Sequence, residues 1–183
     1  MSDSLITKKA LAEALKSLLK EESFTKIRVI DICTRCELNR NSFYYHFKDK
    51  YELANWIFNH EFIEEASKRL FVNGWEFMQA LCEYFYANKD YYIRIFEYEG
   101  QNCFSEYFAE QMSPLITDYF KDIFVEDRYQ NFIAGFFADA FRLAIMRWLK
   151  ERMLTSPREF VDLLQITASG TALKIMQDDE KKG

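Results

Sequence analysis

Glycine and proline are scarce in this chain of 183 residues, with five and two copies, so the punctuation that usually separates β-strands is missing. Only two histidines occur, and neither stands three residues after a glutamate, so there is no Glu-x-x-His metal pair. A Gly-rich phosphate loop and a Ser-centred nucleophile elbow are also lacking. These absences disfavour an all-β or α/β fold and leave an α-helical enzyme only as a weak alternative.

Long uncharged apolar runs are missing as well. The most apolar stretch, residues 132–149, carries Asp139, Arg142 and Arg147, whereas a membrane-spanning helix needs about 18 apolar residues. Residues 1–9 are polar and do not resemble a signal peptide. We therefore expect a cytoplasmic protein with no membrane partner, whose four cysteines are reduced.

Two of the cysteines, Cys33 and Cys36, form a lone Cys-x-x-Cys. Zinc sites and redox sites of this kind usually need a second cysteine pair or a nearby histidine, and the sequence offers neither there. We interpret the two side chains as small core residues and expect no metal and no cofactor.

Hydrophobic residues make up 49% of the chain and aromatic residues 17%, which is enough for a substantial core. Their spacing is helical, and we predict an all-α fold of about nine helices. The first would cover about 4–22 and bury a stripe formed by Leu11, Ala14, Leu15, Leu18 and Leu19. The later ones are expected at about 49–70, 75–88, 91–98, 104–124, 128–150 and 156–177. Capping boxes would open the helices after Asp49 and Ser156, and Pro114 should kink or restart its helix.

Residues 24–53 predict two short helices joined by a tight turn. The first would cover about 29–36 with Ile32 and Cys36 inward, and Asn39 would cap the second. Phe43 and Phe47 would share the buried face of this second helix. The remaining side chains of that helix are donors for phosphates and base edges: Arg40, Asn41, Ser42, Tyr44, Tyr45 and His46.

The charge is distributed to suit such a module. Net charge is −5, yet residues 1–50 hold ten basic and seven acidic residues, while the remainder holds fourteen and twenty-two. A modest basic patch on an acidic body would serve phosphate contacts and limit non-specific binding.

The segment resembles the TetR family of bacterial transcription regulators. The likeness rests on Ile32-Cys33, Glu37-Leu38-Asn39, the run from Phe43 to Phe47, and Lys50. It implies a three-helix DNA-binding module with a helix-turn-helix at residues 1–48 and a regulatory and dimerisation domain at 49–183. A sequence-specific transcriptional regulator that binds operator DNA is thus expected.

The resemblance also assigns DNA contacts. Arg40, Asn41 and Ser42 would face the bases, because the early residues of a recognition helix enter the major groove. Tyr44, Tyr45, His46 and Lys50 would contact phosphates, and so could Arg28, which stands where the family tends to have threonine. Glu37 occupies a turn position often held by glycine, and a left-handed conformation there would cost roughly 1 kcal/mol.

The helix at 128–150 carries two neighbouring apolar stripes, one through Phe132 and Phe136 and one through Phe137 and Phe141. One domain cannot cover both, so a second subunit is the expected cover. Together with the last helix this predicts a homodimer through Phe136, Ala138, Phe141, Ile145, Ala168 and Gly170. The alternative is a buried hairpin within a larger monomer core.

The likeness further implies an effector pocket in the aromatic-rich body. Its expected lining is Trp56, His60, Cys82, Tyr92, Arg94 and Cys103. Residues 39–57 resemble the branch of the family that controls dihydroxyacetone kinase operons, in which a kinase-like coregulator protein replaces a free small-molecule effector. The alternatives are a small-molecule-responsive TetR-type repressor of an unrelated operon and a helical ligand-carrying protein.

Overall fold

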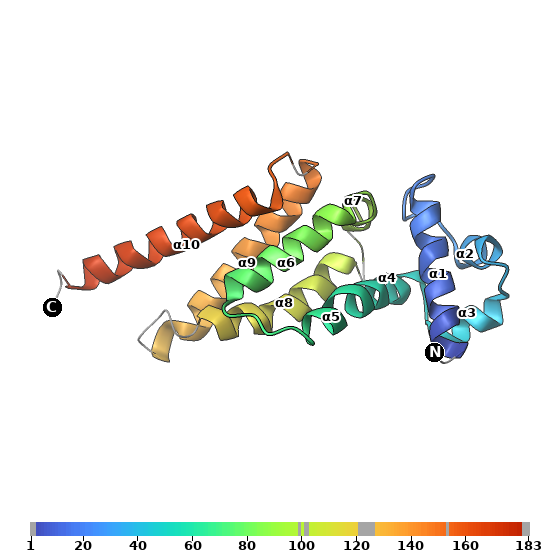
Figure 1. Cartoon of the computed structure of the whole chain (residues 1–183), viewed down its shortest axis with the longest axis horizontal. Coiled ribbons are helices and arrows are strands. Elements are labelled where there is room, and N and C mark those ends of the chain that lie inside the picture. Colours follow the sequence, from blue (N-terminus) through green and yellow to red (C-terminus); the bar gives the residue numbers. More distant parts are fainter. Residues whose placement is uncertain (1–2, 99, 101–102, 121–126, 153, 181–183) are drawn as a thin grey trace. The chain divides into compact units, whose positions relative to one another are not determined.

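The computed structural model describes residues 3–98, 100, 103–120, 127–152 and 154–180, and all regular elements in these ranges are helices (Figure 1). Their bounds are α1 Asp3–Leu19, α2 Val29–Arg35, α3 Arg40–His46, α4 Lys50–Phe58, a π-helical turn Asn59–Ile63, α5 Glu64–Ala66, α6 Gly74–Ala87, α7 Lys89–Phe96, α8 Phe104–Phe120, α9 Asp127–Lys150 and α10 Pro157–Glu180. The predicted all-α class is confirmed. Counted with 50–66 as one uninterrupted helix, the described chain has the nine helices expected.

The chain forms two compact units. The first comprises residues 1–69 and 88–108, and the second comprises 70–87 and 109–183. The unit around the helix-turn-helix therefore takes in α4 and α7 as well as the predicted module at 1–48. The functional division at residue 48 stays a prediction.

The first unit is built on α1, which packs against α2, α3, α4 and α7. The predicted stripe of α1 is buried, with Leu11, Leu15 and Leu19 fully inaccessible to solvent. A second part of this core is aromatic and is centred on Phe58, which contacts the rings of Tyr92, Phe104 and Phe108. Burial of so many rings gives the unit a rigid interior.

The connecting helix that begins at the Asp49 cap changes its pitch near its middle. The Asp49 side chain accepts hydrogen bonds from the backbone of Tyr51 and Glu52, both at 2.9 Å, as predicted. After Phe58 the helix widens into the π turn Asn59–Ile63 and then closes as α5. It ends at Ala66, short of the predicted residue 70. The wide turn keeps Phe58 and Phe62 stacked, with ring centroids 5.5 Å apart.

In the second unit α6 packs against α10, and aromatic pairs join α6 to α9. The ring of Trp75 meets Phe141, and the ring of Tyr86 stacks on Trp148. Trp148 also stacks on Phe160 of α10 at 4.7 Å and donates its indole N–H to the Thr155 carbonyl. These contacts fix the turn between α9 and α10.

The second unit contains the predicted capping box at Ser156 and the helix with Pro114. The capping box is confirmed, because Glu159 accepts from the Ser156 backbone at 3.0 Å while the Ser156 hydroxyl accepts from the Glu159 backbone. Pro114 lies inside α8 and the helix does not restart there, so of the two predicted effects only the kink stays a prediction. The predicted residues 121–124 of this helix lie outside the described ranges.

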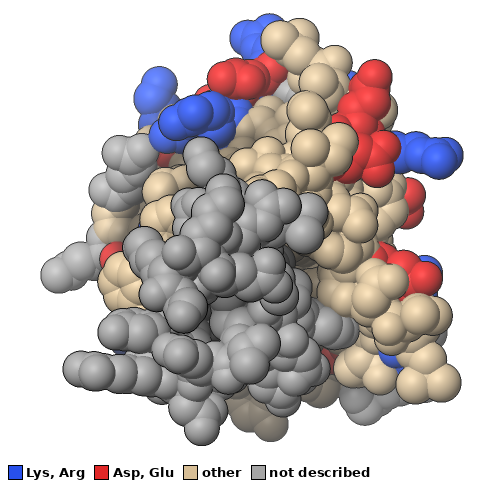
Figure 2. Space-filling model, turned by 90° about the vertical axis from the view of Figure 1, so that its left-hand side faces the viewer, with Lys and Arg blue, Asp and Glu red and all other residues tan. Residues whose placement is uncertain are grey.

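The two apolar stripes of helix α9 differ in burial. Phe137, Phe141 and Ile145 are buried within the unit, whereas Phe132 and Phe136 are 75% and 60% exposed. Further exposed apolar residues are Leu143 on α9 and Leu163 and Ile166 on α10. We call these five exposed residues the outer stripes. Figure 2 shows a face of the molecule on which uncharged side chains cover most of the coloured surface and charged ones stand mainly at the edge.

This burial corrects the predicted dimer residues. Ala138, Phe141, Ile145 and Ala168 are at most 7% exposed in the single chain, so they belong to the core of the monomer. Of the predicted set, Phe136 and Gly170 are on the surface. The apolar periodicity had indicated two faces without indicating which of them the chain itself covers.

Candidate nucleic-acid interface

At the start of helix α2 the Asp31 carboxylate accepts from the N-cap residue Arg28, which has no hydroxyl to cap the helix. The Arg28 backbone N–H donates to Asp31 Oδ2 at 2.8 Å, and the Arg28 guanidinium binds the same carboxylate through two further hydrogen bonds. These hydrogen bonds hold the pKa of Asp31 below its usual value. The Arg28 side chain makes no cap hydrogen bond to the backbone of α2, so the hydroxyl cap expected from the family is absent here, and the side chain remains 75% exposed.

The turn between α2 and α3 uses the left-handed conformation. Glu37 has φ 57°, and the next residue, Leu38, donates its N–H to the Cys33 carbonyl at 2.9 Å. This is the hydrogen-bond pattern with which helices commonly end when a left-handed residue follows. Glu37 therefore adopts the left-handed conformation, whose cost at a non-glycine residue is roughly 1 kcal/mol.

Replacing Glu37 with glycine should raise the free energy of unfolding by about 1 kcal/mol, because glycine adopts positive φ without the steric cost of a β-carbon. Urea denaturation measures the change. Glu37→Ala is the matched control, since it removes the same carboxylate and keeps the β-carbon. A glycine variant no more stable than the alanine variant would contradict the account.

Helix α3, the candidate recognition helix, is fixed in rotation by the buried rings of Phe43 and Phe47. Asn39 caps it as predicted, accepting from the Ser42 backbone at 2.8 Å. Phe43 is fully buried and Phe47, at the C-terminal end, is 3% exposed, so the predicted buried face is confirmed. The opposite surface therefore projects outward, and Tyr45 on it is 83% exposed.

The exposed surface of α3 carries several hydrogen-bonding groups. Arg40 and Asn41 are exposed at its first turn, with the Arg40 guanidinium 5.6 Å above the Tyr44 ring and 3.3 Å from its hydroxyl. His46 is half-buried, and burial together with the positive charge of Lys8 lowers its pKa. The neutral imidazole is consequently favoured at neutral pH, and its ring N–H can still donate a hydrogen bond to a phosphate.

Lys50 was predicted to contact a phosphate, but its side chain is buried in the protein. It is 9% exposed, and its ammonium donates to the carbonyls of Phe24, Thr25 and Ile27 at 2.5, 3.2 and 2.7 Å. Burial lowers its pKa. All three ammonium hydrogens are used inside the protein, so Lys50 ties the loop between α1 and α2 to the start of α4. We remove it from the candidate DNA-contacting residues.

The predicted effector-pocket residues are divided between the two compact units. Tyr92 and Cys103 are buried in the first unit, and Cys82 is fully buried in the second. Arg94 lies half-buried on α7 and does not line the cavity described next.

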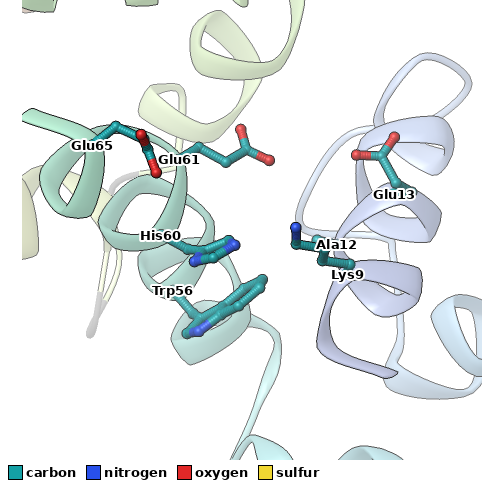
Figure 3. A pocket seen from close by; sticks show the side chains of 7 residues that line it. All are labelled: Lys9, Ala12, Glu13, Trp56, His60, Glu61 and Glu65. Atoms are coloured by element: carbon teal, nitrogen blue, oxygen red, sulfur yellow. The ribbon is translucent and has the colours of Figure 1, made fainter. Parts of the chain in front are cut away.

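Trp56 and His60 do line a cavity of about 370 Å³ within the first unit (Figure 3). Their rings stack at 4.6 Å, and Lys9 and Glu13 of α1 face them across the space. The other lining residues are Ala12, Glu61 and Glu65. Charged neighbours already engage this wall, since His60 Nδ1 is 2.8 Å from Glu64 and the Lys16 ammonium binds Glu61.

The thiols of the Cys-x-x-Cys belong to the module's interior. Cys33 is fully buried, Cys36 is half-buried, and burial raises the pKa of both thiols. Across the ranges that the structure describes, there is no group of three or more His, Cys, Asp or Glu residues placed to hold a metal ion. In the same ranges no helix is long and apolar enough to cross a membrane.

A helix-turn-helix with buried aromatic anchors, exposed donors on its second helix and a helical body defines a helix-turn-helix transcriptional regulator. A family model described as "Transcriptional regulator C-terminal region" of the TetR type matches residues 73–170, more than half of the chain. The chain belongs to the TetR family of transcriptional regulators, whose members bind DNA and act as dimers.

One curated relative and two solved structures extend the likeness. The chain is 29% identical over 133 residues to the HTH-type dhaKLM operon transcriptional activator DhaS of Lactococcus lactis, covering 72% of this chain and 68% of that protein. A solved structure of a dihydroxyacetone kinase operon activator DhaS is 26% identical, covers 89% of this chain and 96% of that one, and gives a TM-score of 0.62. NalD of Pseudomonas aeruginosa, a repressor of a multidrug efflux pump, shares the fold at 15% identity, 93% and 97% coverage and a TM-score of 0.66.

Proposed function

We propose that this regulator controls an operon for dihydroxyacetone metabolism by binding its operator as a homodimer. The observation that carries the proposal is the likeness to DhaS, which extends over most of both chains at 26–29% identity. Because that relative is an operon activator, activation is the mode that the likeness favours. The test is binding to the DNA beside the gene's own operon, with a scrambled duplex of equal length as the control.

For the DNA contacts we retain the surface of α3 and leave out Lys50. Arg40, Asn41 and Ser42 lie in the first turn of α3 and would meet base edges, since this end of a recognition helix enters the major groove. Four other side chains would meet phosphates and fix the register: Arg28, Tyr44, Tyr45 and His46. The exposure of Arg28 and Tyr45 supports their reach.

An Asn41→Ala variant should lose about 1–3 kcal/mol of operator affinity and accept other bases at one position of each half-site, because a bidentate contact from asparagine to adenine carries that discrimination. Tyr45→Phe should weaken all sequences about equally. Affinities for the operator and its single-base variants, at several salt concentrations, measure both effects. Glu83→Ala in α6 is the control. Equal weakening of all sequences by Asn41→Ala would refute base reading by this residue.

The homodimer would use the outer stripes together with Gly170. The stripe of α9 through Phe137 and Phe141 is buried in the single chain. Phe132, Phe136 and Leu163 stay exposed, so the alternative of a hairpin buried wholly in a monomer core does not account for them. A second copy of the chain would remove this apolar surface from water, at about 25 cal/mol per Å². The arrangement supports a four-helix interface made by α9 and α10 of two subunits.

For the signal we propose a coregulator protein of the dihydroxyacetone-kinase kind in preference to a free metabolite. In the described part of the first unit Tyr92, Phe96 and Phe108 are at most 1% exposed and their rings contact one another, which disfavours entry of a small polyol between these side chains. Either signal would act through the connecting helix α4, and only by its different affinity for two positions of that helix. A tenfold change in DNA affinity requires about 1.4 kcal/mol of such a difference.

Calorimetry should show no measurable heat when dihydroxyacetone is titrated into the purified regulator, and saturable binding when a dihydroxyacetone-kinase-like protein is titrated instead. Direct binding of dihydroxyacetone that alone changes operator affinity would exclude the need for a partner. A Trp56→Ala variant tests whether any heat observed with dihydroxyacetone comes from the cavity lined by Trp56 and His60.

A further inference from the structure

A second cavity lies within the other unit, between α8 and α9, and has a volume of about 360 Å³. One wall is apolar and consists of Ala109, Met112 and Ala138, of which Met112 and Ala138 are buried. The rest of the lining is polar: Glu110, Ser113, Asp139 and Arg142. Pockets that hold small ligands combine an apolar wall with a few placed polar groups in this way.

Arg142 is the unusual member of this lining, because its guanidinium is partly desolvated and short of acceptors. The side chain is 26% exposed, and its Nε is buried without a hydrogen-bond partner among the described residues. Nη2 is 3.5 Å from the Asp139 carboxylate, longer than a good hydrogen bond, and Nη1 has only the sulfur of Met146 at 3.8 Å. The two Nη groups therefore lack a good acceptor among the described residues, and an acceptor entering the cavity could supply one.

The best acceptor for a guanidinium is a carboxylate, since two of its donors match the two oxygens. A simple anion would, however, meet two negative groups in the same lining, Glu110 and Asp139, both of which reach solvent. A ligand carrying an ammonium beside its carboxylate satisfies both signs. The wall of Met112 and Ala138 then suits a short aliphatic group, and at about 30 Å³ per water-sized group the space holds about ten heavy atoms.

We propose that the α8–α9 cavity binds a small zwitterion of the amino-acid type, with its carboxylate on Arg142 and its ammonium toward Asp139 and Glu110. Such a ligand bridges α8 and α9, and α9 carries Phe136 and Leu143 of the outer stripes. Binding would favour one placement of α9 and thereby reach the subunit interface. That regulatory consequence rests on the proposed function, whereas the binding itself does not.

The test uses the full chain and the twenty standard amino acids, each added singly, with thermal unfolding and then calorimetry as readouts. A small aliphatic amino acid is expected to raise the unfolding temperature and to bind with saturation. Its decarboxylated amine and its deaminated acid are expected to bind at least tenfold more weakly. The absence of binding by every amino acid would overturn the proposal, and equal binding of the deaminated acid would overturn the zwitterion assignment.

Substitutions of the lining residues test the location of the site through amino-acid affinity, without a DNA-binding assay. Arg142→Lys keeps the charge and loses the paired donors, so affinity should fall at least tenfold, and Asp139→Asn should weaken the amino acid but not the deaminated acid. Arg147→Lys on the same helix is the matched control, since Arg147 does not line the cavity. Unchanged affinity in both Arg142→Lys and Asp139→Asn would overturn the assignment to this cavity. Operator binding without amino acid reports separately on the proposed function.

Discussion

Phe136→Glu is expected to convert the dimer to monomers and to abolish tight operator binding. In a close-packed subunit interface the new carboxylate would be buried without a partner, which costs several kcal/mol. Gly170→Glu should act in the same way, because a β-carbon at Gly170 meets no atom within 4 Å in its own chain. Sedimentation measures the state, and the wild-type dimer should bind half-sites about 34 Å apart.

Leu70→Glu is the control for this experiment, since Leu70 is a fully exposed leucine outside α9 and α10. It should leave the dimer intact. Ala138→Glu should instead unfold the protein, because Ala138 is buried in the single chain and a glutamate there would have no partner. A wild-type protein that is monomeric at micromolar concentration would refute the proposed interface.

Lys50→Met should lower the free energy of unfolding by about 3 kcal/mol, since each buried carbonyl deprived of its donor costs about 1–3 kcal/mol. The three carbonyls of Phe24, Thr25 and Ile27 lose the ammonium together, although the exposed Thr25 is open to water. Urea denaturation gives the magnitude. The control is Lys48→Met, two residues earlier, where the side chain is exposed and the stability should stay within about 0.5 kcal/mol.

The salt dependence of DNA binding distinguishes this role from a phosphate contact. A lysine on a phosphate contributes about one unit to the slope of affinity against salt, so removing it would flatten the slope by that amount. For Lys50 we expect an unchanged slope in the folded fraction of the variant. A flattened slope with unaltered stability would restore Lys50 to the DNA-contacting surface.

Helical periodicity and capping residues determined most of the fold in advance. The stripe of α1, the caps at Asn39 and Asp49 and the box at Ser156 all depend on neighbours within a few residues, so the local sequence contains the information. The exposed surface of α3 was predictable for the same reason. Once Phe43 and Phe47 define the buried side of the helix, the remaining side chains must project outward.

What escaped prediction depends on contacts between distant segments. Nothing near Lys50 in the sequence shows that the loop after α1 presents three carbonyls to it, because those residues lie 23 to 26 positions away. The two stripes of α9 look equivalent until α6 covers one of them through Trp75 and Phe141. The cavities likewise combine residues from separate helices, so their lining could not be read from spacing.

The π turn at Asn59–Ile63 also marks a place where the gene can change its length. A π turn holds one more residue than the α-helical turn it replaces. Loss of a single codon here would restore a regular α-helical turn, and because both turns make about one rotation, the side chains beyond it would keep nearly the same direction. Phe58 and Ala66 would then both stay in the core. A one-codon deletion in this segment is therefore expected to be compatible with the fold, whereas the same deletion within α4 would rotate all later side chains by about 100°.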